Sequence, residues 1–164
     1  MGRWRPPPER SSPYITREGQ DRLEEELDRL WKERRDVVAA LSAAAAEGDR
    51  SENAEYIYRK KQLREMDRRI RYLQKRIPSL KVVDEHPVGS EQVFFGAWVT
   101  LEDEQGKEVT YRIVGPDEID PKQGWISMDS PMAKALMKKR VDDDVIVETP
   151  ERRMEYIIND VRYQ

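Results

Sequence analysis

Apolar residues recur at intervals of three and four in two long segments, which is the pattern of an amphipathic helix. The first segment begins after Thr16, a favoured N-cap residue, and ends before Gly48, a favoured residue after a helix end. The second ends before Pro78. The stripe positions are Leu23, Leu27, Leu30, Arg34, Val37, Leu41 and Ala44 in the first segment and Tyr56, Lys60, Leu63, Met66, Ile70, Leu73 and Ile77 in the second.

Only a few residues separate the two predicted helices. The helices must therefore run antiparallel and bury their apolar stripes against each other, which predicts a coiled-coil hairpin. At about 1.5 Å of rise per residue, the length of the hairpin is on the order of 40 Å.

The pattern changes after Ser79, where short runs rich in β-branched and aromatic residues alternate with turn-forming stretches. We expect these runs to form an antiparallel sheet. One helix interrupts them, because Ser130 supplies an N-cap and Pro131 suits the first helical position. The predicted strands cover residues 81–84, 93–101, 109–114, 125–128, 145–148 and 154–161.

These elements predict an α+β fold in three parts. Residues 1–13 hold four of the ten prolines and no apolar periodicity, so we expect a flexible extension rich in proline and arginine. Residues 14–79 form the predicted coiled-coil hairpin, with its tip at 48–53. Residues 80–164 form a small sheet domain with one helix.

Composition excludes several classes of protein. Of the 164 residues, 38% are charged and 37% hydrophobic, which suits solvated helices with a narrow apolar stripe and not one large core. The absence of cysteine excludes disulfides and thiol chemistry, and the single histidine, His86, excludes a multi-histidine metal site within one chain. The sequence offers neither a secretory signal nor an apolar run of membrane-spanning length. We therefore expect a cytoplasmic protein without a membrane partner, and we expect a monomer.

Charge is distributed unevenly along the chain. The net charge is −3, yet residues 53–77 carry nine basic side chains against three acidic ones. Residues 81–164 are acidic, with 18 acidic and 11 basic side chains. A basic helix of this kind is either a solvated face or a site where a polyanion binds.

The turn between the two predicted helices carries two acids, Asp49 and Glu52. One interpretation is structural, because an acid three residues before a glutamate fits a capping box that starts the second helix. The other is chemical. Magnesium is usually held by one or two carboxylates together with waters and substrate phosphates, so two acids at a tip could complete a site that belongs to another molecule. Such a protein would have little activity alone.

Two separated motifs carry a resemblance to a known family. The residues from Gly48 to Tyr56, Gly-Asp-Arg-Ser-Glu-Asn-Ala-Glu-Tyr, resemble the tip signature of the bacterial Gre transcript cleavage factors. The residues from Ser130 to Leu136, Ser-Pro-Met-Ala-Lys-Ala-Leu, resemble the second signature of that family. The basic stretch from Lys60 to Leu73 is similar to the GreB branch. The resemblance runs from about Tyr14 to the C-terminus and includes the GreB-like stretches 94–99 and 112–118.

The resemblance implies a function. Gre factors bind bacterial RNA polymerase through an FKBP-like C-terminal domain and extend the coiled coil through the secondary channel of the polymerase. The tip then stimulates the polymerase to cleave the 3′ end of nascent RNA in backtracked, arrested complexes, so that elongation resumes. By position, Asp49 and Glu52 are the implied catalytic acids, supported by Ser51, and both would share the second Mg²⁺ of the polymerase active site. The protein would then be no enzyme on its own and would have no cofactor of its own.

The resemblance also implies two binding surfaces. A basic patch on the second helix would steer the extruded RNA, and the second signature would dock on the polymerase. The implied RNA-steering residues are Lys60, Lys61, Arg64, Arg68 and Arg71, and the implied docking residues are Ser130, Pro131, Met132, Ala133 and Leu136.

Three alternatives remain open, and one local feature departs from the family. The first alternative is a non-catalytic regulator of the same fold that occupies the secondary channel. The others are a prolyl isomerase or chaperone built on the FKBP-like domain, and a general nucleic-acid-binding coiled coil.

The departure is Asp142, where the family commonly has glycine; a left-handed turn there is costlier for aspartate than for glycine.

Overall fold

The computed structural model describes residues 11–48, 53–86, 89 and 91–163. The chain divides into two compact units. One contains Gln20–Leu80, and the other combines Met1–Gly19 with Lys81–Gln164. The predicted extension at 1–13 lies almost wholly outside the described residues. Asp49, Ser51 and Glu52 lie outside them as well.

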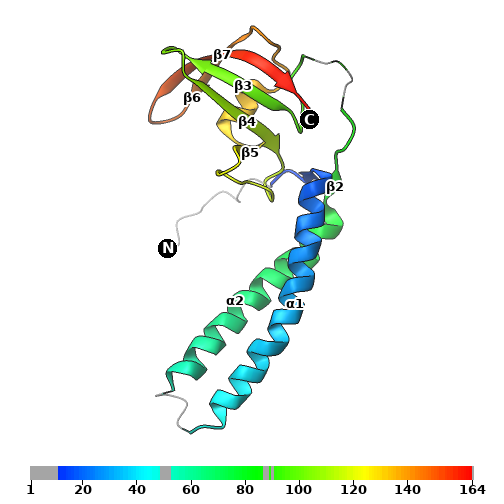
Figure 1. The fold of residues 1–164 in the computed structure, drawn as a ribbon, viewed down its shortest axis with the longest axis vertical. Helices are drawn as coiled ribbons and strands as arrows, with labels where there is room; N and C mark the ends of the chain where they lie inside the picture. The colour runs from blue at the N-terminus through cyan, green and yellow to red at the C-terminus, as the bar shows by residue number, and fades with distance from the viewer. Residues whose placement is uncertain (1–10, 49–52, 87–88, 90, 164) are drawn as a thin grey trace, which may run out of the picture. The chain divides into compact units, whose positions relative to one another are not determined.

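The first unit is a helical hairpin (Figure 1). Helix α1 spans Arg17–Ala45, and helix α2 spans Ala54–Arg76, followed by the 3₁₀ turn η1 at Ile77–Ser79. With 29 residues, α1 is about 43 Å long at about 1.5 Å of rise per residue. The predicted hairpin and its antiparallel pairing are confirmed.

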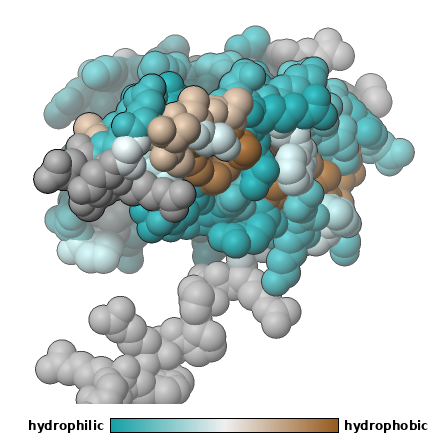
Figure 2. Space-filling view, turned by 90° about the horizontal axis from the view of Figure 1, so that it is seen from below, coloured by the Kyte–Doolittle hydropathy of each residue, from teal (hydrophilic) through white to brown (hydrophobic). Residues whose placement is uncertain are grey.

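The predicted stripes form the contact between the two helices. Leu23 and Val37 of α1 are buried, and so are Met66, Ile70 and Leu73 of α2. In the view of Figure 2, most of the surface is hydrophilic and apolar side chains show only in small separate patches. Lys60 departs from its predicted stripe position, because its side chain is exposed.

Two interhelical ion pairs fix the register of the hairpin. Arg34, the polar residue within the α1 stripe, donates from Nε to Asp67 Oδ1 at 2.7 Å. Arg69 donates from Nη2 to Glu26 Oε2 at 2.9 Å. Because the four residues come from both helices, each pair requires one alignment of α1 against α2. The hydrogen bond with Asp67 raises the pKa of the Arg34 guanidinium above its ordinary value.

The second unit contains a five-stranded sheet in the order β5-β4-β3-β7-β6. Its strands are β3 (Trp98–Asp103), β4 (Glu108–Val114), β5 (Trp125–Ser127), β6 (Asp144–Glu148) and β7 (Arg153–Arg162). The pairs β3–β4, β3–β7 and β6–β7 are antiparallel, whereas β4–β5 is parallel. The sheet is therefore mixed, and the α+β class is confirmed with this one correction.

The core of the second unit lies between the sheet and helix α3 (Pro131–Leu136). Val99, Leu101, Ile113 and Ile158 from the strands are fully buried, together with Leu136 from the helix. His86 lies against Gly96, where a Cβ atom would lie 2.9 Å from the imidazole. Gly96 has φ +87°, and this turn delays β3 to Trp98, later than the predicted start at residue 93.

Asp142 adopts a left-handed conformation, with φ +73°. The turn therefore has the left-handed conformation that glycine favours, and this conformation costs more free energy with aspartate. The Asp142 backbone N–H donates to the Ile158 carbonyl at 2.8 Å, which anchors the turn to β7.

The start of α1 belongs to the second unit. Strand β1 (Tyr14–Ile15) pairs in parallel with β2 (Lys81–Val82), and Ile15 is fully buried. The sequence predicts that the hairpin starts at residue 14, because a two-residue strand leaves no periodic signal. In the structure, residues up to Gly19 group with the sheet unit.

The Glu118 carboxylate holds the start of α1 in place through hydrogen bonds. It is 7% exposed and accepts hydrogen bonds from the backbone N–H of Thr16 at 2.9 Å and of Gly115 at 2.7 Å. It also accepts a hydrogen bond from the Thr16 hydroxyl. That hydroxyl in turn accepts from the Gly19 N–H at 3.0 Å, which confirms Thr16 as the N-cap of α1. A Cβ on Gly19 would lie 2.0 Å from the carboxylate, so no larger residue fits there.

Replacing Glu118 by alanine should lower the free energy of unfolding by about 3 kcal/mol, because two buried backbone N–H groups lose their acceptor. Glu118→Gln should cost less, since its carbonyl oxygen still accepts. Urea unfolding followed by circular dichroism measures both. The exposed Glu104→Ala variant is the control, and equal stabilities of Glu118→Ala and Glu104→Ala would contradict this role.

Candidate functional site

The hairpin turn is short and its two flanks are tied together. Helix α1 ends at Ala45, and Gly48 follows with φ +131°, a conformation that side chains rarely adopt. Asn53 is the N-cap of α2, and its Oδ1 accepts from the Tyr56 N–H at 3.1 Å. The Asn53 Nδ2 donates to the Ala44 carbonyl at 2.7 Å. One side chain therefore starts the second helix and holds the end of the first.

This cap corrects the structural interpretation of the turn acids. The capping box assigned the start of α2 to Asp49 and Glu52, but α2 starts at Ala54 with Asn53 as its cap. Asparagine is among the strongest N-cap residues, so its position directly before Ala54 was the signal that the sequence analysis missed. Asp49, Ser51 and Glu52 themselves lie outside the described residues.

The predicted RNA-steering residues share one face of α2. At about 100° per residue, Lys60, Lys61, Arg64, Arg68 and Arg71 fall within an arc of roughly 100°. All five side chains are exposed. None of the three acidic residues of the helix falls within this arc, which we call the basic face.

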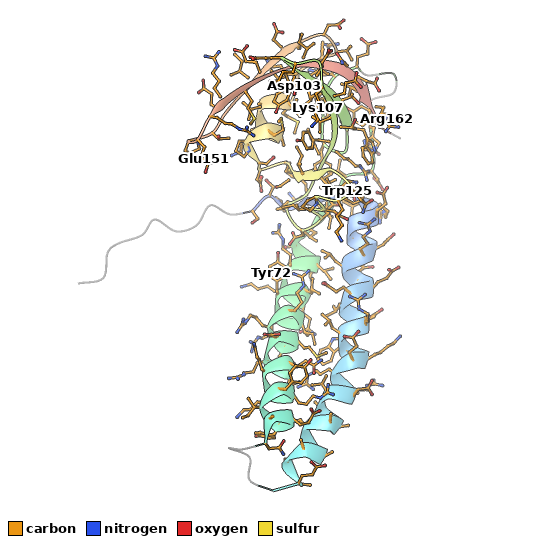
Figure 3. All side chains as sticks on the ribbon, turned by 60° about the vertical axis from the view of Figure 1, so that its left-hand side comes forward. Tyr72, Asp103, Lys107, Trp125, Glu151 and Arg162 are labelled. Atoms are coloured by element: carbon orange, nitrogen blue, oxygen red, sulfur yellow. The ribbon has the colours of Figure 1, made fainter. Side chains whose placement is uncertain are left out.

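The basic face differs from the other arginines of α2 in its partners. Arg59 pairs with Glu55 at 2.8 Å, and Arg69 pairs with Glu26 at 2.9 Å. Within the described part of the chain, no carboxylate lies within ion-pairing distance of a basic-face side chain. Its five cations are accordingly available to an external anion. The long helices carry their charged side chains along their whole length (Figure 3).

The predicted docking residues divide into two groups. Ser130 caps α3 by accepting from the Ala133 N–H at 3.2 Å, which confirms the predicted helix start. Ala133 and Leu136 are fully buried in the core, so their side chains hold α3 in place and offer no surface. Pro131 is exposed and Met132 is partly exposed, so these two remain accessible for docking.

A cluster that the sequence analysis did not single out lies beside the start of α1. The Arg112 side chain is 8% exposed and pairs with Glu18 at 2.6 Å. Its guanidinium carbon lies 5.5 Å from the ring centroid of Trp98 and 4.8 Å from that of Trp125. The buried cation therefore has a carboxylate and two aromatic rings around it. Its residues come from three distant parts of the sequence, so no local motif reveals them.

Among the described residues, no group of three or more histidine, aspartate or glutamate side chains could hold a metal ion. Neither long helix in the described ranges offers the uninterrupted apolar stretch that a bilayer crossing requires.

The two units define a class of protein, a helical hairpin with an acidic turn sequence joined to a small α+β domain. Comparisons identify the family. The profile "Transcription elongation factor, N-terminal" matches residues 13–82, and "Transcription elongation factor, GreA/GreB, C-term" matches residues 88–163. The chain belongs to the GreA/GreB family of transcription elongation factors.

Individual relatives are similar over nearly the whole chain. Transcription elongation factor GreB of Xanthomonas axonopodis pv. citri is 59% identical, covering 99% of this chain and 98% of that protein. GreB of Yersinia pestis is 57% identical over 93% of this chain and 90% of its own. Among solved structures, Gfh1 of Thermus thermophilus is 24% identical with a TM-score of 0.41, covering 91% of this chain and 97% of its own. A GreA/GreB factor from Nitrosomonas europaea is 21% identical with a TM-score of 0.42, covering 93% and 100%.

Asn53→Ala should lower the stability of the hairpin by about 1 kcal/mol or more, because the N-cap is lost together with the bond to Ala44. Asn53→Ser should retain an N-cap oxygen and lose the Ala44 bond, giving a smaller decrease. Thermal unfolding followed at 222 nm measures this ranking. Lys61→Ala, an exposed change on the same helix, serves as the control. If Asn53→Ser proves as unstable as Asn53→Ala, the capping role is wrong.

Proposed function

We propose that this protein binds bacterial RNA polymerase, inserts its hairpin into the secondary channel and stimulates cleavage of the 3′ end of RNA in backtracked complexes. The RNA polymerase active site performs the reaction, and the hairpin turn donates acidic residues to it. The protein is not an enzyme on its own.

The observation that carries this proposal is the Asn53 cap. Because Asn53 starts α2 and binds the end of α1, the start of the second helix does not require Asp49 or Glu52. A purely structural explanation for these two acids is therefore weakened. The connection from Ala45 to Ala54 is short, and both acids belong to it in the sequence. A hairpin that enters a narrow channel turn first would bring this connection to the polymerase active site.

Magnesium fits the chemistry of these acids. It prefers oxygen ligands in octahedral geometry, and two carboxylates supply only part of such a shell. No complete metal site exists among the described residues, so the remaining ligands would come from the polymerase and the RNA. When bound, the ion supplies positive charge beside the scissile phosphate. Asp49 would help to hold it, and Glu52 would orient or deprotonate the attacking water, with Ser51 supporting both.

The basic face serves the RNA. Its exposed cations, without carboxylate partners among the described residues, suit the phosphates of a single strand. RNA extruded by backtracking would pass along α2, with its scissile phosphate at the turn and its 3′ end farther along the helix. Pro131 and Met132 are the accessible part of the docking motif, which would bind the polymerase through the second unit.

Asp49→Ala and Glu52→Ala should each reduce RNA cleavage by at least 100-fold, since each removes a carboxylate from the reacting centre. The measurement uses backtracked polymerase complexes with 3′-labelled RNA and Mg²⁺. Both variants should still compete with the wild type for polymerase. Glu47→Ala, an exposed acid on the same turn, is the matched control and should cleave normally. A wild type that binds polymerase and releases no RNA would instead support the channel-occupying regulator.

Neutralising three residues of the basic face, Lys60, Arg64 and Arg71, to glutamine should weaken binding of a single-stranded RNA oligonucleotide. The slope of log affinity against log salt should fall by about 2, because a single strand releases about 0.7 counterions per phosphate contact. The matched control neutralises three cations of α1, Arg29, Lys32 and Arg35, which alternate with acidic residues in the sequence. Equal losses in the two triple variants would show that binding follows net charge and not the basic face.

A further inference from the structure

Trp31 is exposed on the side of α1. Its side chain belongs to neither the buried stripe nor the core of the second unit, and 43% of its surface is accessible. A large aromatic side chain gains most of its stability from burial, so an exposed tryptophan on a solvated helix suggests a binding role.

The indole lies beside an arginine that binds the other helix. The Arg34 guanidinium carbon lies 6.0 Å from the Trp31 ring centroid. The same guanidinium donates to Asp67 of α2 at 2.7 Å. Trp31 is therefore held beside an interhelical ion pair, on the face of the hairpin where that pair lies.

The antiparallel register places basic residues on this same face. Trp31 lies one turn before Arg34 in α1, and Arg71 lies one turn after Asp67 in α2, so both stand at about the same level of the hairpin. Arg64 and Lys60 follow on the same face of α2 toward the turn. An aromatic ring thus stands beside a row of exposed cations that have no carboxylate partner in the described ranges.

We propose that Trp31 is a stacking platform for a base of single-stranded RNA. Cations that follow a phosphate backbone, combined with an aromatic ring on which a base stacks, are the usual elements of single-strand recognition. The cations around Trp31 favour RNA over a protein partner because they match a row of phosphates. This inference rests on the proposed function for its source of RNA, the strand extruded by backtracking.

Distance along the helix makes the proposal specific. At about 1.5 Å per residue, Trp31 lies about 25 Å from Gly48 at the turn. RNA whose scissile phosphate is at the turn reaches Trp31 only when several nucleotides have been extruded beyond that phosphate. Trp31 should therefore matter for deeply backtracked complexes and not for those backtracked by one or two nucleotides.

The test compares Trp31→Leu with Trp31→Phe on complexes backtracked by about two and about eight nucleotides. At a limiting concentration of the factor, Trp31→Leu should cleave the deeply backtracked complex about tenfold more slowly, because one base stack is lost. Trp31→Phe should retain most of the rate, and the shallow complex should be unaffected. Tyr58→Leu is the matched control, because Tyr58 is 58% exposed and points away from the Asp67 side of α2.

Fluorescence of the free protein gives a second readout that is independent of cleavage. A single-stranded RNA oligonucleotide should quench the wild-type emission by stacking on Trp31, and Trp31→Phe should remove that quenching. Quenching without cleavage by the wild type would support the stacking platform and refute the proposed function.

Two results would overturn the stacking platform. One is a Trp31→Leu variant that matches the wild type on both complexes while Trp31→Phe leaves the quenching unchanged. The other is an equal loss of affinity for polymerase on every complex, because Trp31 would then contact the protein and not the RNA.

Discussion

The Glu118 carboxylate is the contact on which the rest of the structure depends. It joins Thr16 to a loop 102 residues later in the sequence, and both partners are buried. The Thr16 hydroxyl donates to Glu118 and accepts from Gly19, so the N-cap of α1 and the attachment of its first turn to the sheet unit are one network. Because a buried carboxylate is costly unless its hydrogen bonds are made, this network forms as a whole or not at all.

Charge in the hairpin falls into two groups with different consequences. Arg34 and Arg69 each bind a carboxylate on the facing helix, and these pairs specify how α1 aligns with α2. Exposed ion pairs contribute little stability, so their value lies in specifying alignment and the apolar stripe supplies most of the stability. The cations of the basic face have no such partners among the described residues, and they are free for an external polyanion. The charged side chains of α2 thus include some that align the two helices and others that remain available to an external anion.

Local signals predicted most of the fold, and distant contacts account for the errors. The spacing of Leu23, Val37 and Leu73 was sufficient for both helices, and Ser130 with Pro131 was sufficient for the start of α3. The strand at β5 was predicted, but its parallel pairing with β4 was not. The two-residue strand β1 was not predicted, because it is too short for a periodic signal and its partner β2 lies far along the chain. At the site, the five basic residues named from the sequence share one exposed face of α2, and their role toward RNA stays a prediction. The capping-box interpretation was wrong, because the N-cap of α2 is Asn53.

The Asn53 result changes how the acidic turn is interpreted. Among the described residues, Asn53 makes the hydrogen bonds that start α2, with the Tyr56 N–H and the Ala44 carbonyl. Asp49 and Glu52 belong to neither predicted stripe, and they stand three residues apart in the turn sequence. A divalent cation shared with a partner is one use for two such acids. Trp31 likewise lies outside the buried stripe, and it lies on the same face of the hairpin as cations of the basic face. In this hairpin, the residues that the fold does not need are therefore the ones that a partner would use.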